Sequence, residues 1–315
     1  MAAGLTALAL AGAAAGLTHW RAGVQEARAE ERYPPLGQLL DVDGVQVHAH
    51  VEGHGPDLVL IHGSSGNLRD FTFRLLPLLS DHYRVTLMDR PGLGYSDPIS
   101  ADGASLRQQA EVLAGAARQL GAERPIVMGQ SLGGAVALAW AVQHPDQIAA
   151  LVTVSGVSHP WTTGLGAYYT VLSSWPGRHL LIPALTAFLP DRVIEDQIAA
   201  IFAPEPVPEG YGAHFGPRLT LRRGAMRANA LQRRHLLGWI TELAPHYASL
   251  DLPVEILHAT GDRTVGCAIH SKPLSHAIPG ARLTTLDSAS HMPHHTHPGE
   301  VVAAIDRAAA RAGLR

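Results

Sequence analysis

"GQSLGG", residues 129–134, joins the apolar run "RPIVM" (residues 124–128) to the alanine-rich stretch "AVALAWAVQHP". The first run has the composition of a buried strand, and the second favours a helix. A sharp strand-to-helix turn admits only small residues two positions before and after its central residue, and Gly129 and Gly133 flank Ser131 in this way. The free N–H groups at the helix start favour negative charge there. The pattern predicts a nucleophile at Ser131, with a tight structural turn as the alternative.

A serine hydroxyl becomes nucleophilic when a base accepts its proton and an acid orients that base. Asp262 lies in the Gly-Asp turn of "LHATGDRTV", and His291 lies in "LDSASHMPHHTHP" after the last expected strand. The order Ser, Asp, His is expected when all three lie on loops at the carboxyl ends of neighbouring strands. We therefore predict a catalytic triad of Ser131, Asp262 and His291. Three other aspartates lack a position in a tight glycine turn after a strand: Asp251, Asp287 and Asp306.

An earlier glycine-rich turn, in "VLIHGSSG" (residues 59–66), supplies candidate donors for an oxyanion hole. Backbone N–H groups in such a turn, together with the N–H after the nucleophile, can bind the negative oxygen of a tetrahedral intermediate. We expect the N–H groups of Ser64 and Leu132 to take this role.

Short apolar runs alternate with helical patterns along the chain after residue 36. Residues 39–53, "LLDVDGVQVHAHVEG", predict a hairpin that turns at Asp43-Gly44. Later runs end in Gly or Asp, as buried parallel strands do, and "SLRQQAEVLAGAARQLG" predicts a helix between Ser105 and Gly121. This alternation implies a mostly parallel sheet covered by helices on both faces. Residues 158–245 contain no clear strand and several prolines, so we interpret them as a helical insertion.

Composition limits the classes of partner. The 315 residues are 46% hydrophobic, enough for a large core. The 24 Lys and Arg against 27 Asp and Glu give a net charge of −3, which provides no strong field for nucleic acid. We expect a small-molecule partner and no nucleic acid. The single cysteine, Cys267, excludes an internal disulfide.

The first twenty residues carry no charge and are followed by Arg21. About 20 apolar residues span the hydrocarbon of a bilayer, so we expect membrane attachment through residues 1–20. A cleaved signal, with periplasmic location, or a disordered terminus of a cytoplasmic protein are the alternatives. The stretch "RYPPLG" predicts a linker, with the folded unit beginning near residue 36.

Five stretches, in this order, resemble the α/β-hydrolase-fold enzymes that carry a cap: "LIHGSSG", "MDRPGLGYSD", "MGQSLGG", "GDRTV" and "SHMPHHTHP". The resemblance implies an α/β-hydrolase fold with a mostly parallel sheet of about eight strands flanked by helices. Its core would comprise residues 33–157 and 246–315, with a helical cap at 158–245 and an apolar N-terminal segment and linker at 1–32. Dehalogenases and epoxide hydrolases of this family have an aspartate at the turn. Ser131 therefore argues against an alkyl-enzyme route.

Two clusters have simpler explanations than a ligand site. Four histidines lie near the last helix: His291, His294, His295 and His297. Their spacing is that of metal ligands, but no Cys, Asp or Glu lies among them, and His291 is already assigned to the predicted triad. Six arginines within residues 218–234 fit a solvated helix face, with attraction of an anionic substrate or lipid headgroup as the alternative. We expect no metal and no organic cofactor.

The predicted activity is hydrolysis of a small apolar carboxylic ester through an acyl-enzyme. Related enzymes use the same triad to hydrolyse a carbon–carbon bond in a vinylogous diketone, which is the first alternative, and a cofactor-free peroxidase is the second. A ligand-binding protein without catalysis also stays open, because fold does not fix function.

Overall fold

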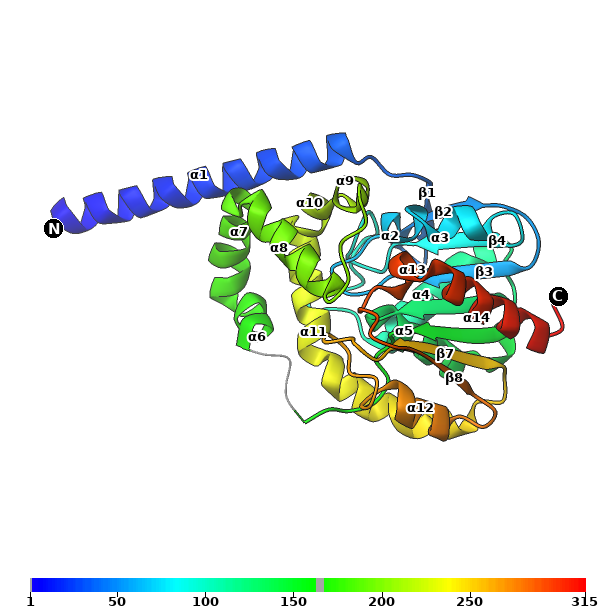
Figure 1. Cartoon of the computed structure of the whole chain (residues 1–315). Coiled ribbons are helices and arrows are strands. Elements are labelled where there is room, and N and C mark those ends of the chain that lie inside the picture. The colour runs from blue at the N-terminus through cyan, green and yellow to red at the C-terminus, as the bar shows by residue number, and fades with distance from the viewer. Residues whose placement is uncertain (1, 163–166) are drawn as a thin grey trace.

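A twisted sheet forms the centre of the molecule, and the computed structural model describes it within residues 2–162 and 167–315 (Figure 1). Its strands are β1 (Gln38–Val42), β2 (Val45–Glu52), β3 (Asp57–Ile61), β4 (Arg84–Met88), β5 (Ile126–Gln130), β6 (Ala150–Val154), β7 (Val254–Ala259) and β8 (Arg282–Leu286). Their spatial order is β1-β2-β4-β3-β5-β6-β7-β8. β2 pairs antiparallel with β1 and β4, and the other pairs are parallel. The predicted mostly parallel sheet of about eight strands is confirmed.

The central strands are apolar throughout because both faces of the sheet are covered. In β3, Val59 and Ile61 belong to the core on one face, and Leu58 and Leu60 belong to the core on the other. Successive side chains of a strand point to opposite faces, so a run without polar residues fits two-sided burial.

Helices from the connections between strands, together with the helices that follow β8, cover these faces (Figure 1). They are α2 (Arg69–Thr72), α3 (Leu75–Leu79), α4 (Leu106–Gln119), α5 (Leu132–Gln143), the 3₁₀ turn η1 (Pro145–Gln147), α12 (Ser271–Ala277), α13 (Pro293–Thr296) and α14 (Pro298–Arg311). α4 begins with a capping box in which Ser105 and Gln108 bond to each other's backbone N–H. Gly121, with φ of 81°, follows its end.

The first two strands form the predicted hairpin. Asp43 and Gly44 both have positive φ, at 51° and 85°, as a two-residue turn of this kind requires. The Gly44 N–H donates to the side chain of Asp41 at 2.8 Å, which closes the turn.

The cap lies between β6 and β7 in the chain. Its elements are α6 (Ala167–Ser173), the π-helical turn η2 (Gly177–Leu181), α7 (Ile182–Phe188), α8 (Asp191–Phe202), α9 (Tyr211–Phe215), α10 (Pro217–Thr220), α11 (Arg223–Leu243) and the 3₁₀ turn η3 (Ala244–Ser249). Two small apolar clusters hold it together, one between α6, α7 and α11 and the other around α8 and α9. Within the described part of residues 158–245, every regular element is helical.

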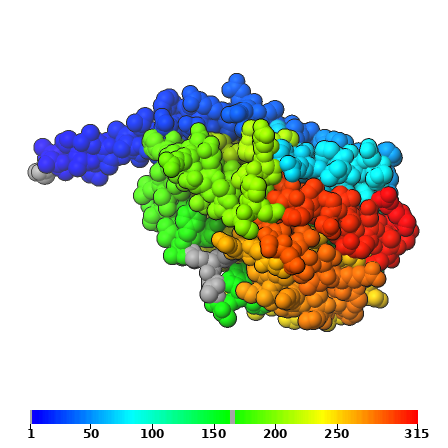
Figure 2. All heavy atoms as spheres, viewed as in Figure 1, coloured from blue at the N-terminus to red at the C-terminus, as the bar shows by residue number. Residues whose placement is uncertain are grey.

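The N-terminal segment is one helix, α1 (Ala2–Arg32), that lies along the cap and projects beyond it (Figures 1 and 2). It is long and apolar enough to cross a membrane by length and composition. Its second half is packed, since Ala22 is fully buried and Ala29 nearly so. The expectation that the folded unit begins near residue 36 is therefore wrong: the charged residues after Arg21 continue the helix and bind the cap.

Candidate active site

Ser131 occupies the turn between β5 and α5. Its backbone has φ of 53° and ψ of −120°, a conformation that costs a non-glycine residue roughly 1–3 kcal/mol. The surrounding chain holds this turn: the Ser131 N–H donates to the Val154 carbonyl at 3.0 Å, and the Ser131 carbonyl accepts from Gly134 and Val157 at 3.0 and 3.1 Å. Strain maintained in this way at the head of a helix is a feature of functional sites.

The two flanking glycines are sterically required. A Cβ on Gly129 would lie 2.2 Å from the Gly133 carbonyl oxygen, and a Cβ on Gly133 would lie 2.2 Å from the Ile61 carbonyl oxygen. Both contacts are with backbone, which cannot give way as a flexible side chain can. Glycine at these positions therefore lets α5 pack directly against β5 and β3.

The structure brings the predicted acid and base into contact. Nδ1 of His291 lies 2.6 Å from Oδ2 of Asp262, whose other oxygen accepts the backbone N–H groups of Thr264 and Val265. Burial by itself would raise the pKa of Asp262, but hydrogen bonds from His258 and His291 outweigh it and hold this pKa well below its usual range. The carboxylate is therefore charged at neutral pH and can orient the imidazole.

His258 is a second imidazole at the acid, and the sequence analysis did not select it. Its Nε2 lies 2.8 Å from the Val265 carbonyl oxygen and 3.3 Å from Oδ2 of Asp262, while its Nδ1 lies 2.5 Å from Oγ of Ser271. The Val265 carbonyl can only accept a hydrogen bond, so Nε2 carries a proton that it donates to this carbonyl, with the carboxylate of Asp262 slightly farther away. A histidine four residues before an aspartate, at the end of an apolar strand, was the available signal.

Ser131 and His291 line the same cavity. Beside them, the Gln130 amide donates to the His291 carbonyl at 3.2 Å and fixes the backbone of the histidine loop. Among the residues described, no direct hydrogen bond joins Oγ of Ser131 to His291. Such bonds are often loose before a substrate is bound. The two side chains thus share a site in which a substrate carbonyl would lie between them.

The two predicted oxyanion donors are unengaged. Within residues 2–162 and 167–315, the N–H groups of Ser64 and Leu132 have no protein acceptor. The Gly63 carbonyl, which shares a peptide unit with the Ser64 N–H, accepts from Arg90 at 2.8 Å and from His62 at 2.9 Å. Because C=O and N–H of a trans peptide point in opposite directions, these two bonds fix the direction of the Ser64 N–H.

Arg90, the buried cation behind this loop, was not selected from the sequence. Its guanidinium also donates to the side-chain oxygens of Gln109 and Gln232, at 2.8 and 2.7 Å, and to the His62 carbonyl at 2.9 Å. Burial lowers the pKa of Arg90 to about 9, so it remains charged at neutral pH. The arginine of "DRPGLGYSD" is therefore a brace for the loop at residues 62–64.

Cap helix α11 contacts the same loop. The Asn229 side chain accepts from the Ser64 hydroxyl and the Ser65 N–H and donates to the Ser65 hydroxyl. Three residues later, Gln232 binds Arg90. The sequence analysis missed both residues, because nothing in a helical stretch marks which polar side chains face a distant loop.

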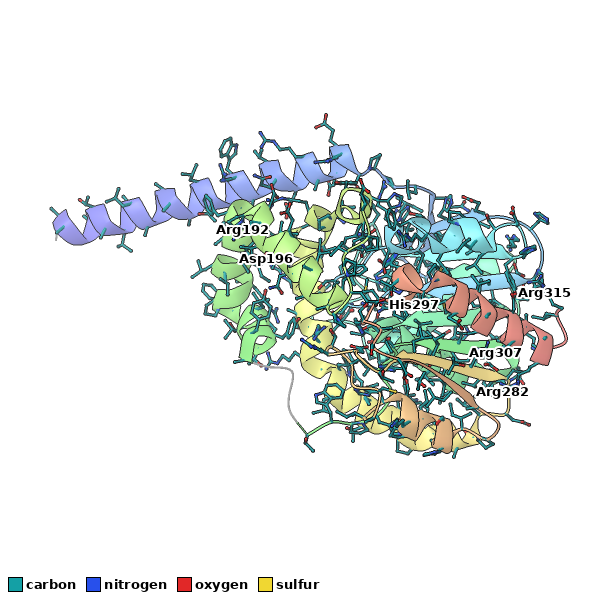
Figure 3. The ribbon with its side chains drawn as sticks, viewed as in Figure 1. Arg192, Asp196, Arg282, His297, Arg307 and Arg315 are labelled. Atoms are coloured by element: carbon teal, nitrogen blue, oxygen red, sulfur yellow. The ribbon has the colours of Figure 1, made fainter. Side chains whose placement is uncertain are left out.

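The four C-terminal histidines separate into different contacts. His291 contacts Asp262, whereas His297, at the junction of α13 and α14 in Figure 3, has its Nδ1 3.4 Å from Oε1 of Glu205. The other two turn toward α2. The four imidazoles therefore do not form a single site.

Asp70, His294 and His295 form a buried network next to the triad histidine. The Nε2 atoms of His294 and His295 lie 3.0 and 2.8 Å from the Asp70 carboxylate, which also accepts from the Tyr211 hydroxyl at 2.8 Å. Burial by itself would raise the pKa of Asp70, but the two imidazoles outweigh it and hold this pKa well below its usual range. The three potential ligand atoms lie within 4.8 Å of one another. A metal there would have to replace these hydrogen bonds, which already join α13 to α2 and to α9.

The cavity has a volume of about 650 Å³, within the range of small-molecule sites. Its floor is polar and includes Ser131, His291 and Ser64. Its cap-side walls are mainly apolar and include Leu172, Leu185, Leu189, Ile194, Ile198 and Ile201. The shape therefore suits a molecule with a reactive polar group and an apolar body.

Half of the arginines in the arginine-rich stretch are paired with acidic side chains. Three of its arginines contact acidic side chains: Arg218 with Asp191, Arg222 with Glu30 and Arg223 with Glu26. Arg233 lines the cavity, and its guanidinium lies 4.5 Å from the ring of Tyr169. Within the described chain, these ion pairs account for three of the six arginines. Arg218 holds α10 to α8 within the cap, and Arg222 and Arg223 hold the cap to α1.

Comparison with known proteins finds similarity to proteins of the α/β-hydrolase fold. A family model described as the alpha/beta hydrolase fold matches residues 56–200. The dihydrolipoyllysine-residue acetyltransferase component of the acetoin cleaving system of Cupriavidus necator is 40% identical over 129 residues, which are 41% of this chain. The alignment spans only 34% of that relative's length.

Two further likenesses cover most of both chains. The 2-hydroxymuconate semialdehyde hydrolase of Pseudomonas sp. is 28% identical over 75% of this chain and 81% of its own. The crystal structure of a membrane phospholipase A, a bacterial virulence factor, superimposes with a TM-score of 0.67 at 20% identity. It covers 98% of this chain and 99% of its own, so the match extends into the N-terminal helix.

Proposed function

We propose that this chain, which has the α/β-hydrolase fold, is a serine hydrolase that cleaves an apolar carboxylic ester by acyl transfer. The observation that carries this proposal is the constellation at one cavity. A strained serine, an imidazole bound to a charged carboxylate, and Ser64 line this cavity, and the N–H groups of Ser64 and Leu132 have no acceptor within the part of the chain that the structure describes.

In the first step, Oγ of Ser131 attacks the ester carbonyl carbon while Nε2 of His291 accepts its proton. Negative charge develops on the carbonyl oxygen, and the N–H groups of Ser64 and Leu132 bind it. Asp262 stabilises the imidazolium. His291 then gives the proton to the leaving alcohol oxygen, so the C–O bond breaks and an acyl-enzyme remains.

In the second step, water attacks the acyl carbon while His291 accepts one of its protons. The tetrahedral intermediate uses the same two N–H donors, and its collapse releases the acid and returns the proton to Ser131. No step uses a metal or an organic cofactor.

We also infer that the N-terminal half of α1 attaches the protein to a membrane. The support is its uncharged first twenty residues, the exposure of residues 2–17, and its length. The likeness to a membrane phospholipase A, which extends over α1, agrees with this location.

A second candidate is hydrolysis of a carbon–carbon bond in a vinylogous diketone. The likeness to a 2-hydroxymuconate semialdehyde hydrolase over three quarters of the chain favours it. The same triad can serve both reactions, so the difference lies in the walls of the cavity.

A substrate panel tests the proposal. Full-length protein in detergent is assayed against p-nitrophenyl esters of graded chain length and a dienoic diketone, and labelled with a fluorophosphonate. We expect ester turnover and a single label on Ser131, with activity lost in proportion to labelling. Turnover of the diketone alone would favour the second candidate. Labelling at another residue with Ser131 unmodified would reject the mechanism.

A further inference from the structure

The cap exposes large apolar side chains on α6 and around η2. The exposed fractions reach 70% for Trp175, 58% for Leu180 and 54% for Tyr168. We define the cap apolar face as these residues: Tyr168, Val171, Trp175, Leu180 and Leu181. Single exposed apolar residues are normal on a protein surface, but a group of them on two neighbouring elements indicates a surface that binds a partner or a membrane.

This face lies where α1 leaves the cap. Nε2 of His19 lies 3.3 Å from the His179 carbonyl oxygen, within η2. Two residues later, Arg21 donates to the Ala187 carbonyl at 2.9 Å, and its guanidinium lies 5.2 Å from the Phe188 ring. The exposed apolar half of α1 therefore begins at the level of η2 and the end of α7, as the projecting helix in Figures 1 and 2 illustrates.

The direction of α1 is fixed relative to the cap. Glu26 binds both the backbone N–H and the guanidinium of Arg223, with distances of 2.6 to 2.9 Å, and Glu30 binds Arg222 at 2.7 Å. Ala22, one turn before Glu26 on α1, is fully buried, and α1 packs against α7 and α10 of the cap. A helix held by packing and two ion pairs cannot swing freely, so its first half determines which side of the protein meets a membrane.

The free part of α1 matches a bilayer. Residues 2–18 at a rise of about 1.5 Å each span about 26 Å, close to the hydrocarbon thickness of about 30 Å. Trp20, which is 65% exposed, lies on α1 at the end of this part, and Trp175 lies in the cap between α6 and η2. Tryptophan is favoured at the interface between lipid and water. Arg21 on α1 and Arg178 on η2 provide positive charge suited to lipid phosphates.

We propose that the cap apolar face rests in the interface of the lipid bilayer that α1 crosses, and that the ester substrate enters the cavity from that bilayer. This proposal rests on the proposed ester hydrolase. Anchor and cap then form one membrane-binding unit, and the α/β core is held away from the lipid.

The cavity reaches the same region of the cap. Tyr168 belongs to the cap apolar face and also lines the cavity, and Val193, which is 39% exposed, lines it from α8. Leu172 on α6 and Leu185 on α7 supply the inner wall. Each of α6, α7 and α8 therefore has one side toward the cavity. The opposite side of α6 belongs to the cap apolar face and would meet the membrane. An apolar ester moving from lipid to Ser131 would follow an apolar path.

Fluorescence tests the location of the face directly. Full-length Trp20→Phe protein is reconstituted in phosphatidylcholine–phosphatidylglycerol vesicles with and without brominated acyl chains, beside Trp20→Phe/Trp175→Phe protein. We expect bromine quenching in the first protein that is largely lost in the second. Equal quenching in both would place Trp175 outside the bilayer and overturn the proposal. A second outcome would also overturn the proposal: the protein forms a dimer in detergent, Trp175→Gln abolishes this dimer, and bromine does not quench Trp175. The cap apolar face would then be a contact between two copies of the chain.

Kinetics test the route of entry. The variant Trp175→Gln/Leu180→Gln/Leu181→Gln is compared with Leu39→Gln/Leu78→Gln/Ile269→Gln, which changes similarly exposed residues of the core. We expect the cap variant to lose about tenfold in kcat/KM for a long-chain ester dissolved in vesicles. It should keep its rate on a short water-soluble ester within about twofold, and the core variant should keep both. Unchanged vesicle rates in the cap variant would reject lipid-side entry. Absence of all ester hydrolysis in wild type would reject the proposed function, and the quenching result would then stand alone.

Discussion

Asn229 in the cap and Ser64 in the loop after β3 are joined by a hydrogen bond of 2.7 Å, although 165 residues separate them in the chain. The same amide oxygen accepts the Ser65 N–H at 2.9 Å. Ser64 is also the proposed oxyanion donor, so the cap takes part in setting the direction of that donor. Cap and catalytic floor are thus one structure, and cap substitutions can alter the chemical step as well as binding.

The first prediction follows from this contact. Asn229→Ala should lower kcat on a short ester by about tenfold with a smaller change in KM, because the loss affects the transition state more than the ground state. Asn229→Asp keeps the acceptor oxygen and should recover part of the rate. Thr241→Ala on the same helix, whose hydroxyl donates to the Leu237 carbonyl one turn earlier, is the control. Equal losses in kcat for Thr241→Ala and Asn229→Ala would contradict the contact's specific role.

The second prediction concerns His258, a positioning residue for the acid. His258→Ala should lower kcat by about tenfold, and on an Asp262→Asn background the further loss should be about twofold or less, because both changes act through one carboxylate. Steady-state kinetics of the four proteins give the coupling. His276→Ala, an exposed histidine of α12, is the matched control. Fully additive effects of the two changes would mean that His258 does not act through Asp262.

The network around Asp70 gives a prediction about stability. Asp70→Asn should lower the free energy of unfolding by about 2–4 kcal/mol, because it leaves buried donors without a charged acceptor. Tyr211→Phe should cost about 1 kcal/mol, since only one hydroxyl is removed. Tyr83→Phe, which breaks a similar bond to the more exposed Asp306, is the control and should cost less. Urea unfolding measures all three. A stable Asp70→Asn protein would show that the network contributes little.

Two buried histidines predict how stability depends on pH. Burial, and then Arg90, lowers the pKa of His62 to about 4, and burial followed by neighbouring histidines lowers the pKa of His270 to about 4. The unfolded chain, with a pKa of about 6.5, binds these protons first, so the free energy of unfolding should fall as pH decreases from 6.5 toward 4. Each group contributes at most about 3 kcal/mol. The slope begins about one pH unit above 6.5, where the unfolded histidines start to bind protons, and above about pH 7.5 neither group contributes.

His270→Gln tests this dependence. Nδ1 of His270 accepts the N–H groups of Ser158 and His159, at 3.3 and 3.2 Å, so its neutral form is the one the fold requires. The substitution should flatten the decline in urea stability between pH 6.5 and 5, whereas His246→Gln, an exposed histidine, should not. An unchanged slope in His270→Gln would show that His270 does not titrate differently on folding.

The sheet and the nucleophile turn were predictable from sequence because their signals are local. An apolar strand followed by Gly129, Ser131 and Gly133 encodes both the strain and the close packing within a few residues. Arg90 and Asn229 gave no such signal, because their roles depend on partners outside their own segments: those of Arg90 lie 19 to 142 residues away, and Ser64 lies 165 residues from Asn229. A side chain that supports a distant loop looks like any polar residue of its own segment.

The N-terminal helix was misjudged for a related physical reason. The mixed charges after Arg21 have the composition of a linker, but Glu26 and Glu30 find their partners on α11. Two ion pairs and two buried alanines are enough to order the helix on the cap. Only the fold brings Arg222 and Arg223 to that place.

The last prediction concerns the triad as a unit. Ser131→Ala should abolish fluorophosphonate labelling and lower kcat on the best ester by about 10⁴-fold or more, and His291→Ala should be nearly as damaging. Asp262→Asn should be severe but milder, because the acid orients and stabilises the imidazole without taking its proton. The triple variant should be little worse than Ser131→Ala, since each change disables the same machinery. The residual rate in all of them should come from the N–H groups of Ser64 and Leu132 and from the cavity. Single-turnover assays and circular dichroism of each variant separate lost chemistry from lost folding. Wild-type turnover by a folded Ser131→Ala protein would make Ser131 a turn residue only, and the acyl-enzyme route would fail.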